Sequence, residues 1–107
     1  MTTVHLTGDG RGVTAIRVSG HAGYADSGSD IVCAAASVLI TTCANALESV
    51  AGICPLVGQT QEPAMIEVSL PKGLSPDQDH DARLIVSAIA QGFRDIAAQY
   101  PKHLQIF

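Results

Sequence analysis

Hydrophobic and polar residues alternate near the start of the chain, a pattern typical of β-strands. Val4 and Leu6 alternate with polar neighbours over Thr3 to Thr7, and Ile16 and Val18 do so within Val13 to Gly20. The segment Gly8-Asp9-Gly10-Arg11-Gly12 between them is rich in glycine, which tolerates the positive φ of tight turns. The pattern therefore predicts an N-terminal β-hairpin.

The same alternation recurs later in the chain. Ala64 to Leu70 places Ile66, Val68 and Leu70 on one face, and His103 to Phe107 is a short last strand. Leu56 to Gln61 is compatible with a further short strand, followed by a turn at Glu62-Pro63, although its pattern leaves this open.

Two longer segments have helical periodicity. Asp30 is a good N-cap for a helix over Ile31 to Ile53, which would place Cys33 at the third helical position. Ser75-Pro76-Asp77-Gln78 resembles a capping box for a second helix that runs to about Gln99. Its predicted inward stripe is Ile85, Ile89, Phe93, Ile96 and Tyr100.

The first helix carries two apolar stripes, so we expect it to be covered on two sides, by the sheet and by a second subunit. The expected dimer would form through this leftover face of the helix or through an edge strand of the sheet. One stripe consists of Ile31, Ala35, Val38, Leu39, Thr42, Ala46 and Val50, and the other of Cys33, Ser37, Ile40, Ala44, Leu47 and Ala51.

The order strand-strand-helix-strand-strand-helix-strand predicts an α+β fold of two layers. We expect a small, mostly antiparallel sheet with both helices packed on one face. A length of 107 residues fits one domain, residues 1–107. Hydrophobic residues make up 47% and charged residues 15%, which suits a packed core and not a disordered chain.

Charge and cysteine content narrow the function classes. The net charge is −4 and the six basic residues are scattered, which argues against direct binding to nucleic acid or to an anionic membrane. The N-terminus has no signal-peptide pattern, and Ser37, Thr41 and Thr42 interrupt the longest apolar run, so we expect no membrane span. Three cysteines without a paired framework favour a cytoplasmic protein with reduced thiols.

The candidate chemistry lies in Gly20 to Ala46. Cys33 is either a small buried helix residue or a nucleophile, because free N–H groups and partial positive charge in a first helical turn would stabilise its thiolate. His21 is the candidate base, since the small and polar loop Ala22 to Ser29 could bring it to Cys33. Cys43 and Cys54 lack such a setting and are interpreted as core or helix-end residues.

Asp30 and Ser37 each have two interpretations. Asp30 would cap the helix or orient His21 in a Cys-His-Asp arrangement. Ser37, one turn after Cys33, would bond the substrate or thiolate, or bond back to its own helix. A metal site is not expected, because Cys33 and Cys43 would lie roughly 15 Å apart along one helix and the chain has no C-x-x-C pair.

The segments Gly20-His21-Ala22-Gly23-Tyr24-Ala25 and Ser29-Asp30-Ile31-Val32-Cys33-Ala34-Ala35, with Ser37, closely resemble the ribosomal-processing cysteine protease family, Prp. The resemblance implies His21 as the catalytic histidine and Cys33 as the nucleophile, with supporting acidic and serine positions at Asp30 and Ser37. It also implies a cytoplasmic homodimer that needs no cofactor. Its substrate would be the precursor of a large-subunit ribosomal protein, from which it removes an N-terminal extension after an aromatic residue during ribosome assembly.

A cysteine endopeptidase is therefore the leading hypothesis. In it, first-turn N–H groups would stabilise the oxyanion, and the loop Ala22 to Ser29 would close over bound peptide with Tyr24 as its contact. The competing hypothesis is a non-catalytic ribosome-associated module or a thiol redox sensor with the same fold. The pH dependence of Cys33 alkylation and an assay for peptide cleavage would distinguish them.

Overall fold

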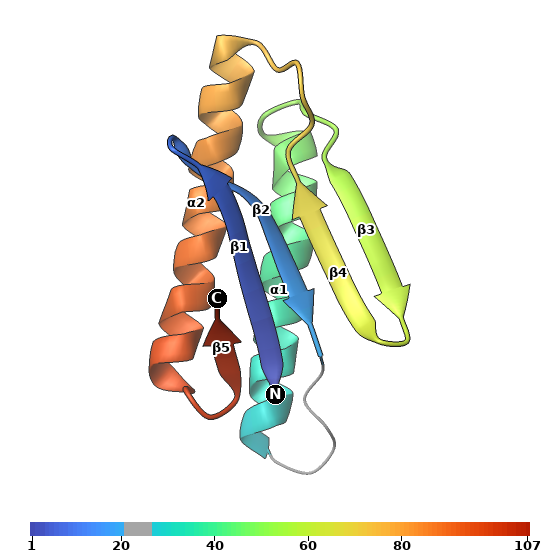
Figure 1. Ribbon diagram of the computed structural model, residues 1–107, viewed down its shortest axis with the longest axis vertical. Helices are drawn as coiled ribbons and strands as arrows, with labels where there is room; N and C mark the ends of the chain where they lie inside the picture. Colours follow the sequence, from blue (N-terminus) through green and yellow to red (C-terminus); the bar gives the residue numbers. More distant parts are fainter. Residues whose placement is uncertain (21–26) are drawn as a thin grey trace.

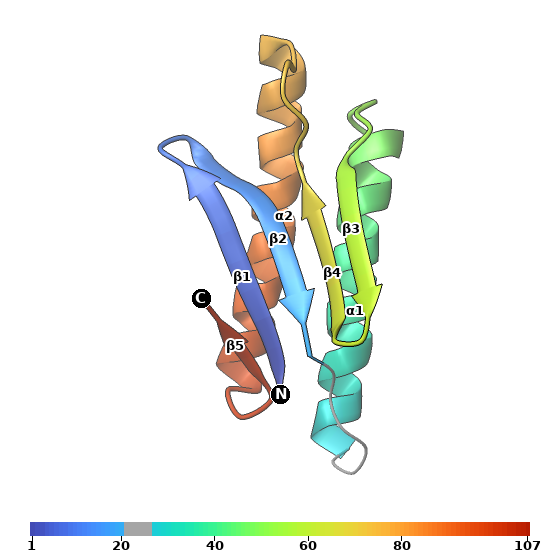
Figure 2. The ribbon, with the colours of Figure 1, turned by 45° about the vertical axis from the view of Figure 1, so that its right-hand side comes forward.

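The computed structural model describes residues 1–20 and 27–107, with only the backbone described at 27–30. Two helices cover one face of a five-stranded sheet (Figures 1 and 2). Along the chain, the helices and strands follow one another in the predicted order, strand-strand-helix-strand-strand-helix-strand. The elements are β1 (Thr2–Asp9), β2 (Gly12–Ser19), α1 (Ser27–Ser49), β3 (Leu56–Gln61), β4 (Ala64–Ser69), α2 (Pro76–Gln99) and β5 (Leu104–Ile106).

The strand order across the sheet is β3-β4-β2-β1-β5. All neighbouring pairs are antiparallel except β1 and β5, which pair in parallel from Thr2 opposite Leu104 to Val4 opposite Ile106. The connection from β2 to β4 passes through α1 and the edge strand β3, so the last strand of the second hairpin, β4, lies inside the sheet between β3 and β2. This topology places β3 at one edge and the three-residue β5 at the other.

The core lies between the sheet and the helices. Alternate residues of the strands point toward the helices, and each helix contributes one buried stripe. The buried residues are Val4, Ile16, Val18, Val68 and Leu104 from the strands, Val32, Ala36, Ile40, Cys43 and Leu47 from α1, Ile53 from the segment after α1, and Ala82, Val86, Ile89, Ala90 and Phe93 from α2.

The second helix begins as predicted. The Ser75 hydroxyl accepts a hydrogen bond from the Gln78 N–H, the Gln78 side chain accepts one from the Ser75 N–H, and Pro76 occupies the first turn. Of the predicted inward stripe, Ile89 and Phe93 are buried, and the part-buried members pack against the core.

The first helix differs from the prediction at its start. It begins at Ser27 and not after Asp30, so the interpretation of Asp30 as N-cap is wrong. Ser27, Ser29 and Asp30 are all favourable N-cap residues, and composition alone does not choose among them. As a consequence, Ser27–Ser29 belong to the helix and not to the predicted loop. Helix α1 ends at Ser49, four residues before the predicted end.

The buried stripe of α1 is neither of the two that periodicity suggested. It draws Ile40 and Leu47 from one of them and adds Val32, Ala36 and Cys43. Ile31 and Val38 are instead 55% and 65% exposed, on the opposite side of the helix. A single chain does not test the prediction that a second subunit covers this side of α1. In the single chain, this side of the helix is exposed to solvent.

The prediction of no membrane span rested on the longest apolar run being too short to cross a bilayer. That reason was wrong, because the run is long enough. Ile31–Ser49 has a mean hydropathy of 1.7 over a length that suffices for a span. Composition alone cannot separate such a span from the core helix of a folded domain, and the buried stripe of α1 packs against the sheet. In this structure 28% of that apolar window is buried, so the segment supplies the buried stripe of α1 and leaves other apolar residues exposed.

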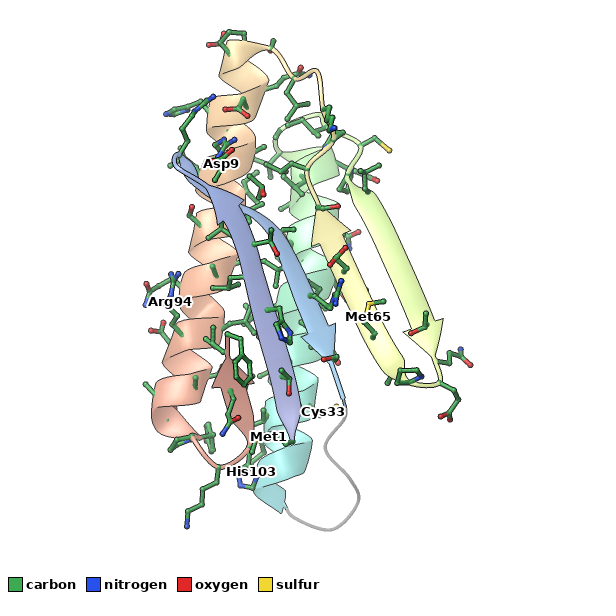
Figure 3. The ribbon with its side chains drawn as sticks, in the orientation of Figure 1. Met1, Asp9, Cys33, Met65, Arg94 and His103 are labelled. Carbon is green, nitrogen blue, oxygen red and sulfur yellow. The ribbon has the colours of Figure 1, made fainter. Side chains whose placement is uncertain are left out.

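Four charged residues hold the tip of the β1–β2 hairpin against the first turns of α2, at the top of Figure 3. The Arg83 guanidinium donates two hydrogen bonds of 2.8 Å to the Asp9 carboxylate and one of 3.0 Å to Asp79. Arg11 also pairs with Asp79. Hydrogen bonds from the Arg83 side chain, and then from the Arg11 N–H, lower the pKa of Asp9 well below its usual range.

The lowered pKa of Asp9 predicts an acid-dependent contribution to stability. Because the folded state holds the carboxylate ionised, this contribution is complete above pH 4 and is lost as the pH falls toward the folded-state pKa. Asp9→Asn should therefore lower the urea midpoint at pH 7 and leave a smaller difference from wild type at pH 3. The effect is modest because the Asp9 side chain is half exposed. A midpoint difference that does not change with pH would contradict the prediction.

Candidate active site

Cys33 lies on the N-terminal half of α1, close to the end of β2 (Figure 3). Its side chain is half-buried and lines an open cavity of about 330 Å³. The cavity separates α1 from the ends of β2 and of the β3–β4 hairpin. Its lining residues are Cys33, Ala36, Ser37 and Ile40 of α1, Thr2, Val18 and Gly20, and Gln59, Thr60, Gln61, Ala64, Met65 and Ile66 of the hairpin.

The cavity combines an apolar floor with a polar rim. Val18, Ala36 and Ile40 are buried core residues, so the floor is a continuation of the hydrophobic core. The exposed Ser37 hydroxyl lies on the helix side, one turn after Cys33, and the Gln59 and Gln61 amides lie on the hairpin side. A peptide could therefore bury an apolar side chain here while its main chain meets hydrogen-bonding groups.

Gly20 ends β2 at the mouth of this cavity. Its N–H donates to the Ala64 carbonyl at 3.0 Å, which ties the strand end to the hairpin. Its φ is +74°, and a Cβ atom at this position would lie 2.6 Å from the Met1 carbonyl oxygen. Both observations require glycine here. The chain therefore leaves the sheet along a restricted path at the residue before His21.

The structure brings three of the predicted site residues to one cavity, namely Gly20, Cys33 and Ser37. His21 and Tyr24 lie outside the described residues, and so does most of the predicted loop. The Asp30 backbone belongs to α1, and its side chain is not described, so its predicted role as an orienter of His21 stays a prediction. Among the described histidines, His5, His80 and His103 do not line the cavity.

The position of Cys33 in the helix differs from the prediction. Because α1 begins at Ser27, Cys33 lies about 9 Å along the helix axis from the first residue of the helix, which is beyond the first turn. The free N–H groups and the partial positive charge of a helix N-terminus act within that first turn. First-turn N–H groups are therefore too far from Cys33 to stabilise its thiolate, and this prediction was wrong. The prediction that the same groups stabilise an oxyanion at Cys33 was wrong for the same reason.

The other two cysteines are in different environments. Cys43 is fully buried in the core, and its burial raises the pKa of the thiol to about 11, so this thiol stays protonated near neutral pH. Cys54 is exposed after the end of α1, with its thiol near the Pro55 carbonyl. Cys33 is thus the cysteine that lines the cavity. Among the side chains that the structure describes, no cluster of three potential metal ligands occurs.

Sequence reasoning missed the hairpin side of the cavity. Gln59 to Ile66 come close to Cys33 because β4, and not β3, pairs with β2. Strand periodicity says which residues share a face but does not give strand order. A signal was present in the turn Glu62-Pro63, which predicts a tight hairpin and places the two strands side by side.

Comparison with known proteins agrees with this architecture. The sequence model of the family described as cysteine protease Prp matches residues 1–105. The ribosomal processing cysteine protease Prp of Bacillus subtilis (strain 168) is 25% identical over 96 residues, which cover 90% of this chain and 86% of the relative.

Solved structures share the fold. Prp from S. aureus in complex with a substrate peptide superposes with a TM-score of 0.84 at 22% identity, over 100% of this chain and 98% of the other. Its complex with a covalently linked product peptide gives 0.81 at 23% identity, over 99% and 97% of the two chains. SMU.848 from Streptococcus mutans gives 0.87 at 24% identity, over 99% and 91%. With the family match over nearly its whole length, the chain belongs to the cysteine protease Prp family.

Proposed function

We propose that this chain is a cysteine endopeptidase of the cytoplasm that removes the N-terminal extension of a large-subunit ribosomal protein and so supports ribosome assembly. The observation that carries the proposal is the placement of Cys33 in the lining of an open cavity, with Gly20, the residue before His21, at its mouth. Membership of the family and the ribosomal processing role in the name of the Bacillus subtilis relative support it.

The proposed reaction uses a Cys-His dyad. His21 accepts the thiol proton of Cys33, and the sulfur attacks the carbonyl carbon of the scissile peptide bond. When the C–N bond breaks, the histidine returns the proton to the leaving amine, and an acyl-enzyme remains on Cys33. Water, deprotonated by His21, then attacks the thioester and releases the acid product and the free thiol.

The oxyanion of this reaction needs donors other than the first turn of α1. Among the described residues, the Ser37 hydroxyl and the amides of Gln59 and Gln61 line the same cavity as Cys33. We assign Ser37 as the first candidate, because it lies one turn away on the same helix face. Asp30 remains a candidate to orient His21.

The test is cleavage of the ribosomal protein precursor by the purified chain, followed by mass spectrometry. Loss of the N-terminal extension at one peptide bond is expected, and alkylation at Cys33 should abolish it. The pH dependence of Cys33 alkylation, compared with that of Cys43 and Cys54, reports whether the thiol is activated. A reactive Cys33 without any cleavage of the precursor would favour a redox sensor over a protease.

We further propose a homodimer formed through the outer side of α1. Ile31 and Val38 lie two turns apart on one side of that helix and are 55% and 65% exposed. Two large apolar side chains at this spacing form a continuous strip, and a chain of this size gains from covering it. A two-fold interface would pack the strip against its own copy.

Val38→Glu should convert the dimer to a monomer, because two buried carboxylates would face each other across the two-fold axis. Sedimentation velocity at micromolar concentration measures the change. Leu84→Glu is the matched control, since Leu84 is 59% exposed on α2 and away from this strip. A wild-type chain that sediments as a monomer, or a Val38→Glu chain that still sediments as a dimer, would contradict the interface.

A further inference from the structure

The strand β3 forms an unprotected edge of the sheet (Figures 1 and 2). Its last three residues, Gln59, Thr60 and Gln61, line the cavity of Cys33. All six residues of β3 are exposed, and none of them is charged or proline. Folded proteins normally protect such edges with charge, proline, a bulge or short length, because open main-chain groups recruit other strands. The opposite edge is protected in this way, since β5 has only three residues.

The hydrogen bonds of β4 determine which groups of β3 are free. The Ala64 carbonyl accepts from Gly20, and the Leu70 N–H donates to the Thr14 carbonyl, so the main-chain groups of these even-numbered positions face β2. The odd-numbered residues of β4 therefore face β3, where their partners are Thr60, Gly58 and Leu56.

It follows that Val57 and Gln59 turn their N–H and C=O groups away from the sheet, to the open edge. Their side chains share the face of Val68 and Ile66, which is the helix side. Gln59 thus has its side chain in the lining of the Cys33 cavity and its main-chain groups on the free edge. The cavity and the edge are continuous through this residue.

The cavity is too small to hold a whole substrate peptide, which suggests a role for the open edge of β3. At about 330 Å³ the cavity lies at the small end of ligand cavities, enough for the residues next to a scissile bond. The rest of a peptide must continue outside it, and a path on the hairpin side would pass the rim formed by Gln59, Thr60 and Gln61. The free main-chain groups of the edge begin in that rim, at Gln59, and continue at Val57.

We infer that the substrate segment on one side of the scissile bond binds as an added strand on the open edge of β3. This inference rests on the proposed function and names how its substrate is held. Main-chain pairing gives affinity that is independent of substrate side chains. Specificity for the residues next to the cleaved bond comes from the cavity, which binds their side chains. Alternate residues of the bound segment point their main-chain groups toward β3.

The test is a scan of precursor peptides that carry one N-methylated amide each, outside the two residues on either side of the scissile bond. On one flank, methylation at every second position should lower kcat/KM about 3- to 10-fold, and methylation at the positions between should leave it nearly unchanged. On the other flank, no alternation is expected. Equal effects at consecutive positions on both flanks would overturn the inference while leaving the protease function intact.

A pair of variants tests the same point from the enzyme side. Val57→Pro removes an N–H that faces the open edge, and the β3–β4 ladder loses no donor because the Val57 N–H does not face β4. It should raise KM several-fold, while Val57→Ala, which keeps the N–H, should not, since Val57 does not line the cavity. If Val57→Pro instead leaves KM unchanged and alters sedimentation relative to the wild-type chain, the edge is an interface between two copies and the inference fails. If the unmodified peptide is not cleaved at all, both the inference and the proposed function fail.

Discussion

Replacing Cys33 by alanine is expected to lower kcat/KM for the ribosomal protein precursor by about 10⁴-fold or more, because the variant has no atom to form the acyl-enzyme. Alanine leaves the fold in place, since the Cys33 side chain is only half-buried and alanine is the best helix former. Cleavage is measured by mass spectrometry, and folding by thermal melting.

Cys54→Ala is the matched control for this variant. Cys54 is equally a free thiol, but it is exposed beyond the end of α1 and does not line the cavity. It should retain the wild-type rate. His21→Ala should lose about as much as Cys33→Ala, and the double variant no more than either, because residues that act as a unit are not additive. Retained cleavage in Cys33→Ala would exclude the proposed nucleophile.

Much of the fold followed from short-range patterns. The alternation in Ala64 to Leu70 predicted β4 to within one residue, and Ser75 with Gln78 predicted the start of α2. These features depend on residues within one or two turns of each other, which the sequence displays directly.

The start of α1 and its buried side could not be obtained in this way. Several N-cap residues precede Ile31, and the choice among them depends on how the chain returns from β2. The buried side of α1 includes alanine and cysteine, small residues that fit against a sheet but give weak hydrophobic signals. Ile31 and Val38, which give strong signals, lie on the open side.

The sequence indicated the part of the candidate site that lies on α1 and at the end of β2, but not the part on the β3–β4 hairpin. Gly20, Cys33 and Ser37 lie within 18 residues of chain, so their proximity could be argued from the sequence. Gln59 and Gln61 complete the cavity through strand order, which results from packing of the whole sheet and not from any local pattern. Specific polar contacts such as Arg83 to Asp9 depend on the same long-range arrangement.

Gly20→Ala is the second substitution with a large expected effect. The new methyl group would meet the Met1 carbonyl oxygen at 2.6 Å, and backbone atoms cannot move away as a flexible side chain can. The φ of +74° adds about 1–2 kcal/mol for a residue with a Cβ atom. The end of β2 must therefore shift, and with it the residue that carries the proposed base. A shift of about 1 Å in a catalytic group can cost about 10²-fold in rate.

Gly73→Ala separates the two causes. Gly73 has a similar φ of +80°, but a Cβ atom there would meet nothing within 4 Å. The residue lies in the connection between β4 and α2, far from the Cys33 cavity. It should lose about 1–2 kcal/mol of unfolding free energy from the backbone conformation alone and keep its activity. Gly20→Ala should lose more stability than this, and about 10²-fold in kcat/KM as well. Urea unfolding and precursor cleavage measure both quantities in both variants. If the two variants behave alike, the contact with Met1 does not set the path of the chain into His21, and the glycine is needed for its φ only.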